Sequence, residues 1–225
     1  MSKLSAAPVH RVAVALLALC LVSPAIASDK PSKKTAKAPS TSSTSAADKA
    51  AADAAKAQQD AMMAEMAKYA TPGPMQTDFM KPLTGTWKTV TTTYMGPKPE
   101  TSEGTCTRSM VLGDRFLESK HSGVFAGVPF EGMELLGFDT RKNQFSSVWI
   151  DNMGTSMAVS TSGSYDAATK TLTINSSFDD PVSGKPMAYK MVTHVIDPNK
   201  HVFTMVENKD GKDVTDMEIT YTRVQ

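Results

Sequence analysis

Cysteine is scarce in this sequence, and neither sign of charge is in excess. Two cysteines among 225 residues cannot build a disulfide-rich scaffold or a Cys-rich zinc site. The 24 Lys and Arg residues balance 23 Asp and Glu residues, so we do not expect the basic surface of a nucleic-acid-binding protein. Only one long apolar run occurs, at the very start, which excludes a membrane protein with several spanning segments.

The first 27 residues have the pattern of a secretory signal peptide. Basic residues at Lys3, His10 and Arg11 precede an apolar run over residues 12–22, which is too short to span a bilayer comfortably. The small-x-small sequence that ends at Ala27 predicts cleavage there, and an uncleaved anchor is the alternative. We therefore expect an exported protein, in the periplasm or outside the cell, that is not an integral membrane protein after cleavage.

Two segments of different composition precede the main domain. Residues 28–47 consist mostly of Ser, Thr, Lys, Ala and Pro, which predicts a disordered linker. Residues 48–70 are rich in Ala, Lys, Gln and Met and contain no Gly or Pro, which predicts a helix. Met62, Met66 and Tyr69 share one face of this helix, and we expect that face to pack on the domain that follows.

We expect the main domain to span residues 71–225, and from residue 76 onward the pattern changes to the period of two that is typical of β-strands. Short turns separate about ten such segments, after one short helical turn at 77–83. Short turns imply an antiparallel meander, because parallel strands need long crossovers. Closure into an up-and-down β-barrel would remove the exposed edges, whereas a β-sandwich would need long connections that are absent. The expected strands span 84–95, 101–112, 115–124, 130–139, 144–152, 155–163, 171–177, 187–197, 201–208 and 212–224.

Several short motifs of this β-rich segment occur together in one bacterial family. They include Leu83–Trp87 (LTGTW), Val111–Glu118 (VLGDRFLE), Trp149–Thr155 (WIDNMGT) and Met217–Arg223 (MEITYTR). With these motifs the chain resembles the DUF1579 family over about residues 70–225. The resemblance implies a calycin-like fold, similar to lipocalins and fatty-acid-binding proteins, but no established activity. The Gly-x-Trp of the first motif resembles the lipocalin signature, in which the Trp closes one end of the barrel.

A ligand site is expected on the strand at 144–152. Trp149 and Asp151 share one face of this strand, whereas Val148 and Ile150 occupy the other. If Trp149 and Asp151 face inward, the barrel holds an aromatic cavity with one carboxylate, as a ligand site would. The alternative is that Asp151 only shapes the hairpin end. The residues that we expect to bind a ligand are Trp149, Asp151, Arg115, Glu131, Phe138 and His194.

The histidine and cysteine residues do not form a recognisable metal site. No HExxH or close His-x-His motif occurs, so we expect no bound metal. His194 and His201 flank one turn and could approach each other across it. A haem held by His194 inside the barrel is one option, against an ordinary cross-strand pair, and otherwise we expect no cofactor. Cys106 is expected to be a buried, unreactive small side chain.

Three functions remain open from the sequence. The first, which we favour, is a binding module whose barrel holds a small, largely apolar molecule. The second is an enzyme that uses a pair of carboxylates in the same cavity. The third is a structural or partner-binding domain with a filled barrel, whose helix around 62–69 forms the contact surface. Because no nucleophile elbow, nucleotide fingerprint or other recognised catalytic motif occurs, we assign no catalytic residue.

Overall fold

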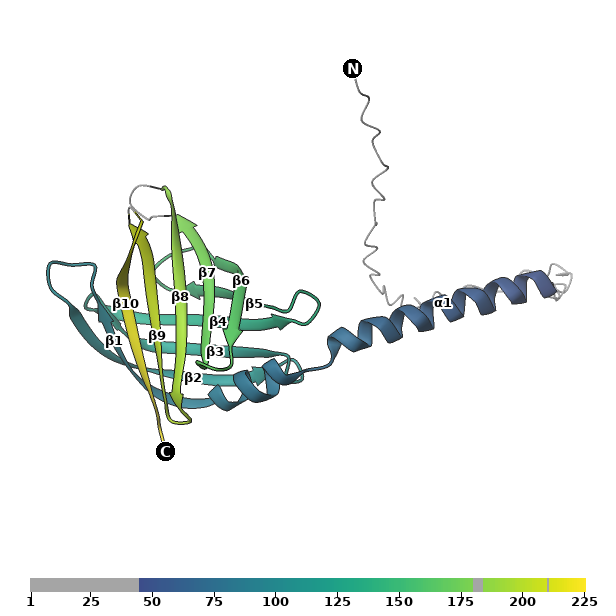
Figure 1. The fold of residues 1–225 in the computed structure, drawn as a ribbon, viewed down its shortest axis with the longest axis horizontal. Helices are drawn as coiled ribbons and strands as arrows, with labels where there is room; N and C mark the ends of the chain where they lie inside the picture. Colours follow the sequence, from purple (N-terminus) through teal and green to yellow (C-terminus); the bar gives the residue numbers. More distant parts are fainter. Residues whose placement is uncertain (1–44, 180–183, 210) are drawn as a thin grey trace, which may run out of the picture. The chain divides into compact units, whose positions relative to one another are not determined.

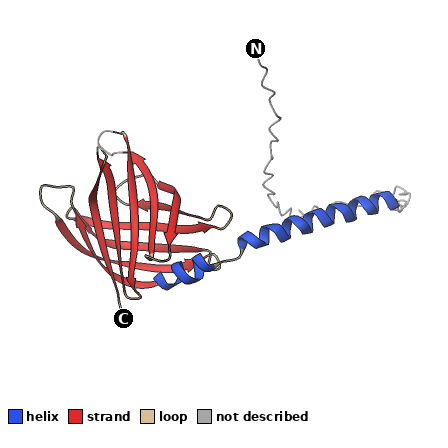
Figure 2. Cartoon of the chain, in the orientation of Figure 1, coloured by secondary structure: helices blue, strands red, loops and turns tan. Residues whose placement is uncertain are grey.

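The computed structural model of the chain describes residues 45–179, 184–209 and 211–225 (Figure 1). These residues form one α-helix, two short helical segments and ten β-strands (Figure 2). The predicted signal peptide at 1–27 and most of the predicted linker at 28–47 lie outside them. Within the described residues, no helix combines the length and the apolar character that crossing a membrane requires.

Helix α1 spans Ala46–Ala70, in close agreement with the predicted helix at 48–70. Its alanine content favours this conformation without any contribution from packing. No residue of α1 is buried, and Met62 and Met66 are 57% and 49% exposed. Tyr69, the third residue of the predicted face, contacts the turn that contains Arg141, whose guanidinium carbon lies 4.6 Å from the centre of the Tyr69 ring.

The ten strands form one closed barrel, in which each strand pairs antiparallel with the next and β1 also pairs with β10 (Figure 1). This confirms the predicted up-and-down antiparallel barrel. The pairing follows from the short turns, which leave each strand beside the one before it. The strands are β1 Gly85–Thr93, β2 Glu100–Val111, β3 Phe116–Phe125, β4 Val128–Asp139, β5 Gln144–Asp151, β6 Ala158–Asp166, β7 Thr171–Asp179, β8 Pro186–Asp197, β9 Lys200–Lys209 and β10 Lys212–Arg223.

Strand β6 is the one strand whose predicted boundaries are clearly wrong. It was expected at 155–163 but begins at Ala158 and continues to Asp166. Tyr165, expected in a turn, belongs to the strand because its ring packs on Phe79, with the ring centroids 4.3 Å apart. The turn starts after Asp166, whose Oδ1 accepts the Ala168 N–H at 2.8 Å.

A short helical segment before β1 closes one end of the barrel. The predicted turn at 77–83 is observed as a π-helical segment, η1 Met75–Met80, and a 3-10 segment, η2 Lys81–Leu83. We call residues 75–83 the plug. Its buried side chains pack on apolar side chains that lie near one end of their strands. The residues in this core are Phe79, Met80, Leu83, Leu117, Leu136, Phe145, Leu172 and Ile174.

Trp87 is buried beside the plug and ties it to the barrel. Its Nε1–H donates to the Leu83 carbonyl oxygen at 3.0 Å, and the Arg223 guanidinium carbon lies 4.1 Å from the centre of its ring. Arg223 Nη1 also donates to the Thr84 carbonyl oxygen at 2.6 Å. At Gly85 the φ angle is +114°, and a Cβ there would lie 2.8 Å from Arg223 Nη1, so this position requires glycine.

Truncation of the plug should destabilise the whole barrel. Phe79→Ala removes a buried ring that packs edge-on against Phe145, with centroids 5.6 Å apart. We expect the free energy of unfolding to fall by about 3–5 kcal/mol. Met95→Ala is the matched control, because Met95 is 62% exposed, and it should cost less than about 0.5 kcal/mol. Urea unfolding followed by circular dichroism measures both, and equal losses would contradict the role of the plug.

Candidate functional site

Trp149 and Asp151 face the interior of the barrel, which decides between the two faces left open by the sequence. Their strand mates Phe145 and Ser147 are buried, and alternate residues of a strand share a face. Trp149 Nε1–H donates to Asp151 Oδ2 at 2.7 Å. The Trp149 ring also covers Gly132, where an added Cβ would lie 2.5 Å from two ring carbons. The two predicted residues are therefore one unit of the inner wall.

Deeper in the barrel, polar side chains from distant strands meet. Arg108 on β2 lies across from Ser119 on β3, and Ser119 lies across from Glu134 on β4. On the neighbouring wall, His201 on β9 lies across from Tyr221 on β10. We call Arg108, Ser119, His201 and Tyr221 the arginine cluster. All four residues are buried, with Arg108 7% exposed and His201 and Ser119 0% exposed.

Direct contacts connect the arginine cluster. Arg108 Nη1 lies 2.7 Å from His201 Nε2, and the Arg108 guanidinium carbon lies 4.6 Å from the centre of the Tyr221 ring. The rings of His201 and Tyr221 are stacked, with centroids 4.4 Å apart and an interplanar angle of 13°. The partners of the buried cation are thus a neutral ring nitrogen and an aromatic face. The carboxyl group whose charge interacts with Arg108 is that of Glu134, which lies across from Ser119 on the inner face.

The burial of these groups shifts their protonation. Burial, with repulsion from Arg108, lowers the pKa of His201 to about 2 and that of His121 to about 3, so both imidazoles are neutral near pH 7. Burial raises the pKa of the inward Glu134, and the attraction of Arg108 opposes that rise. Burial also raises the pKa of the Cys106 thiol, whose Sγ lies 3.5 Å from His121 Nε2. A thiol held in its neutral form is a poor nucleophile.

Three buried polar atoms of the arginine cluster have no hydrogen-bond partner: Arg108 Nε, Ser119 Oγ and His201 Nδ1. Because a guanidinium can only donate, the contact between Arg108 and His201 assigns the acceptor role to His201 Nε2. In a neutral imidazole the proton then sits on Nδ1. The cluster therefore presents two N–H donors and one hydroxyl that lack acceptors. Buried donors of this kind are rare in folded proteins.

An apolar wall continues from the arginine cluster toward the other end of the barrel. Phe203 on β9 lies across from Ile219 on β10, and both pack beside Trp87 and Tyr221. One step farther along the strands, three inward methionines lie side by side, one on each of β8, β9 and β10. These methionines are Met191, Met205 and Met217. Thioether side chains adapt to the shape of whatever they contact.

Arg115 and Phe138, two of the predicted ligand-binding residues, lie at the closed end of the barrel. Arg115 is exposed in the turn between β2 and β3, where its Nη1 donates to the Leu112 and Gly113 carbonyl oxygens at 3.1 Å each. Phe138 packs on Phe145 in the core around the plug, with ring centroids 4.9 Å apart. Both line a small hollow of about 90 Å³ beside residues 69–72, which lead into the plug. The structure does not bring them together with Trp149.

Glu131 and His194, the other two predicted residues, lie on the outer face of the barrel. Glu131 is exposed, and its N–H donates to Asn152 Oδ1 at 3.0 Å. His194 is exposed and contacts Thr171 Oγ1 through Nδ1 at 3.2 Å. The next residue, Val195, lies across from His201 in the ladder between β8 and β9, and residues directly across from each other share a face. His194 and His201 therefore point to opposite faces. His194 therefore does not reach the interior where the haem option would place a ligand.

Sequence reasoning missed the arginine cluster. One signal was available, because Cys106, Arg108 and Met110 alternate on one strand and the first and last of them suit a core. No comparable signal marked His201. The set Val202, Thr204 and Val206 is as apolar as the set of alternate positions that begins at His201, so periodicity could not select the inner face.

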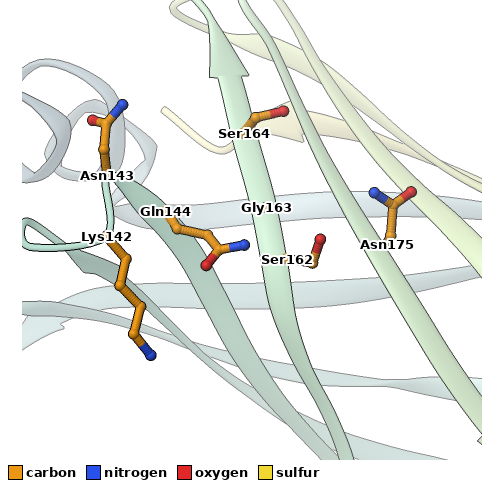
Figure 3. A pocket seen from close by; sticks show the side chains of 7 residues that line it. All are labelled: Lys142, Asn143, Gln144, Ser162, Gly163, Ser164 and Asn175. Atoms are coloured by element: carbon orange, nitrogen blue, oxygen red, sulfur yellow. The ribbon is translucent and has the colours of Figure 1, made fainter. Parts of the chain in front are cut away.

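A second hollow lies on the outer wall, where the ladder between β5 and β6 shifts its register between Phe145 and Ser147. It measures about 280 Å³ and presents amide, hydroxyl and ammonium groups, as Figure 3 shows. Its residues are Lys142, Asn143, Gln144, Ser162, Gly163, Ser164 and Asn175. The hollow is open and has no apolar side chain, so it lacks the features of an enclosed ligand site. Across the described part of the chain, His, Cys, Asp and Glu residues form no group of three that could hold a metal ion.

The buried imidazoles should make stability depend on pH. Their folded pKa values lie below the unfolded value of about 6.5, so the unfolded chain binds more protons as the pH falls below 6.5. We expect a loss of about 2 kcal/mol of unfolding free energy per histidine between about pH 7 and pH 5. His201→Gln should reduce the dependence by about half, whereas His194→Gln should not change it. Urea titrations at both pH values test this, and an unchanged slope for His201→Gln would contradict it.

Comparison with known proteins identifies a family but no activity. Residues 71–223 match the family described as Protein of unknown function (DUF1579). No curated protein matches the chain. Among solved structures the chain is similar to a redesigned β-barrel, b11L5F_LGL, with 19% identity and a TM-score of 0.34 over 65% of this chain and 96% of that one. Because the family match covers more than half of the sequence, this protein belongs to the DUF1579 family.

Proposed function

We propose that this protein is an exported, lipocalin-like binding module that holds a small, largely apolar molecule inside its barrel. The observation that carries the proposal is an apolar patch of the inner wall beside the polar groups of the arginine cluster. The patch consists of Phe203, Ile219, Met191, Met205 and Met217, and Met191 also packs against the core around the plug. A mostly apolar wall with a small number of polar groups is the usual composition of a site for a small molecule.

The difference in packing between the two ends of the barrel supports a site above the plug. Around the plug, Leu117 and Phe145 are 1% and 0% exposed. Farther along, the large inward side chains Phe203, Met205 and Ile219 are only half-buried. Side chains of this size that filled the interior together would bury one another almost completely. Their exposure favours a lumen that is open to solvent at the end opposite the plug.

Binding of an uncharged apolar probe tests this proposal. Titration of the purified protein with N-phenyl-1-naphthylamine should give a saturable rise in fluorescence with about one site per chain. Met205→Glu places a charge on the inner wall and should weaken binding by about tenfold or more. Val206→Glu is the matched control, because this neighbouring residue points outward. No saturable binding by the folded protein, or equal effects of the two variants, would show that the barrel is filled.

Export rests on the first 27 residues of the sequence and has its own test. We expect the protein recovered from the periplasm or the medium of the producing cells to begin at Ser28. Intact-mass spectrometry measures this directly. A recovered chain that retains residues 1–27 would indicate an uncleaved anchor instead.

A further inference from the structure

The inference concerns the polar end of the proposed ligand, so it rests on the proposed function. The arginine cluster holds three polar atoms without partners on side chains that are 0% to 7% exposed: Arg108 Nε, Ser119 Oγ and His201 Nδ1. These atoms belong to neighbouring side chains, because Arg108 contacts His201 and lies across from Ser119 in the ladder. An unpartnered buried donor costs about 1–3 kcal/mol, and three of them on neighbouring side chains favour an acceptor that they share.

The charge of the site restricts the acceptor further. Arg108 keeps its positive charge at any physiological pH. It contacts the neutral His201 ring and the face of Tyr221, and it attracts the inward Glu134, which lies across from Ser119. Burial raises the pKa of Glu134, which favours the neutral form of that carboxyl group. Two of the three free groups, Arg108 Nε and His201 Nδ1, are N–H donors, and Ser119 can donate its hydroxyl proton. An uncharged oxygen would accept from the donors but would add no negative charge beside the buried cation. A carboxylate supplies two acceptor oxygens and a negative charge.

The wall beside the cluster defines the rest of the molecule. From the cluster outward, β9 presents His201, Phe203 and Met205 to the interior, and β10 presents Tyr221, Ile219 and Met217 in the same order. Over these three pairs, both strands change from polar to apolar in the direction that leads away from the plug. Beyond the methionines the wall is polar again, because Glu207 of β9 and the buried Asp216 of β10 both pair with Lys209. A molecule that lies along them has its charged end beside Arg108 and its apolar part between Phe203, Ile219 and the methionines.

We infer that the barrel binds amphiphilic carboxylates, with Arg108, His201 and Ser119 holding the carboxylate and the wall of β8, β9 and β10 holding the apolar part. Arg108 supplies the charge and one N–H group, His201 supplies a second N–H group, and Ser119 supplies a hydroxyl. Neither Arg115 nor Asp151 takes part in holding the carboxylate. Arg115 is exposed in the turn between β2 and β3, and Asp151 is an acceptor that already receives the Trp149 N–H.

Displacement of N-phenyl-1-naphthylamine by two ligands with the same chain tests the inference. Decanoate carries a carboxylate, whereas 1-decanol carries an uncharged hydroxyl group. We expect decanoate to bind the native protein at least about tenfold more tightly than 1-decanol near pH 7.5. Arg108→Met should abolish this preference and leave the affinity for 1-decanol within about threefold. Arg141→Met, which removes an exposed arginine from a turn, is the matched control and should keep the preference.

If Arg108→Met does not fold, two other measurements test the carboxylate site. Ser119→Ala removes one donor without removing the charge and should weaken decanoate, but not 1-decanol, by about threefold or more. In the native protein, decanoate labelled with ¹³C at the carboxyl group should stay ionised to a lower pH when bound than when free, because Arg108 favours the charged form.

Each outcome separates the inference from the proposed function. Equal affinities for decanoate and 1-decanol, together with saturable probe binding, would overturn the carboxylate site and leave the apolar site standing. A bound carboxyl group that titrates at or above its free pKa would also overturn the carboxylate site. No binding of the probe or of either ligand would overturn the proposed function itself.

Discussion

The hydrogen bonds between β1 and β10 join the two ends of the sheet and turn it into a closed ring. Closure leaves no sheet edge exposed, and it gives every strand one inner and one outer face. On the inner face, residues that are far apart in the sequence come into contact. Arg108 and His201, which are 93 positions apart, meet in this way. The plug, the apolar wall and the arginine cluster all exist only because the ring is closed.

The barrel contains two kinds of interior. Near the plug, apolar side chains pack closely around Phe79, and this core provides stability. Above it lies a buried cation whose close partners are an imidazole and an aromatic ring. Burial of charge is unfavourable, so the packed core and the closed ladder must offset the cost. Perturbed buried groups cluster at functional sites, and this tendency supports the proposed binding site.

The candidate site could be predicted only in part. Periodicity correctly placed Trp149 and Asp151 on one face of β5, but it could not say which face was the inner one. Phe138 does point inward, yet it lies at the level of the plug, because position along the barrel depends on the stagger between strands. On β9, both sets of alternate residues suit an apolar face, so His201 was not distinguished from His194. The boundaries of β6 depend on contacts with distant residues, because Tyr165 packs on Phe79 and the ladder with β5 changes its register beside Phe145.

The amino-acid sequence by itself determined the helix, the number of strands and their antiparallel order. These features depend on local propensity, on a period of two and on short turns, all of which act over a few neighbouring residues. Only the tertiary structure decided which faces point inward, which strand ends are plugged and which polar groups surround Arg108. Those features depend on the register between strands and on the closure of β1 with β10, and register is a property of pairs of strands and not of any one segment.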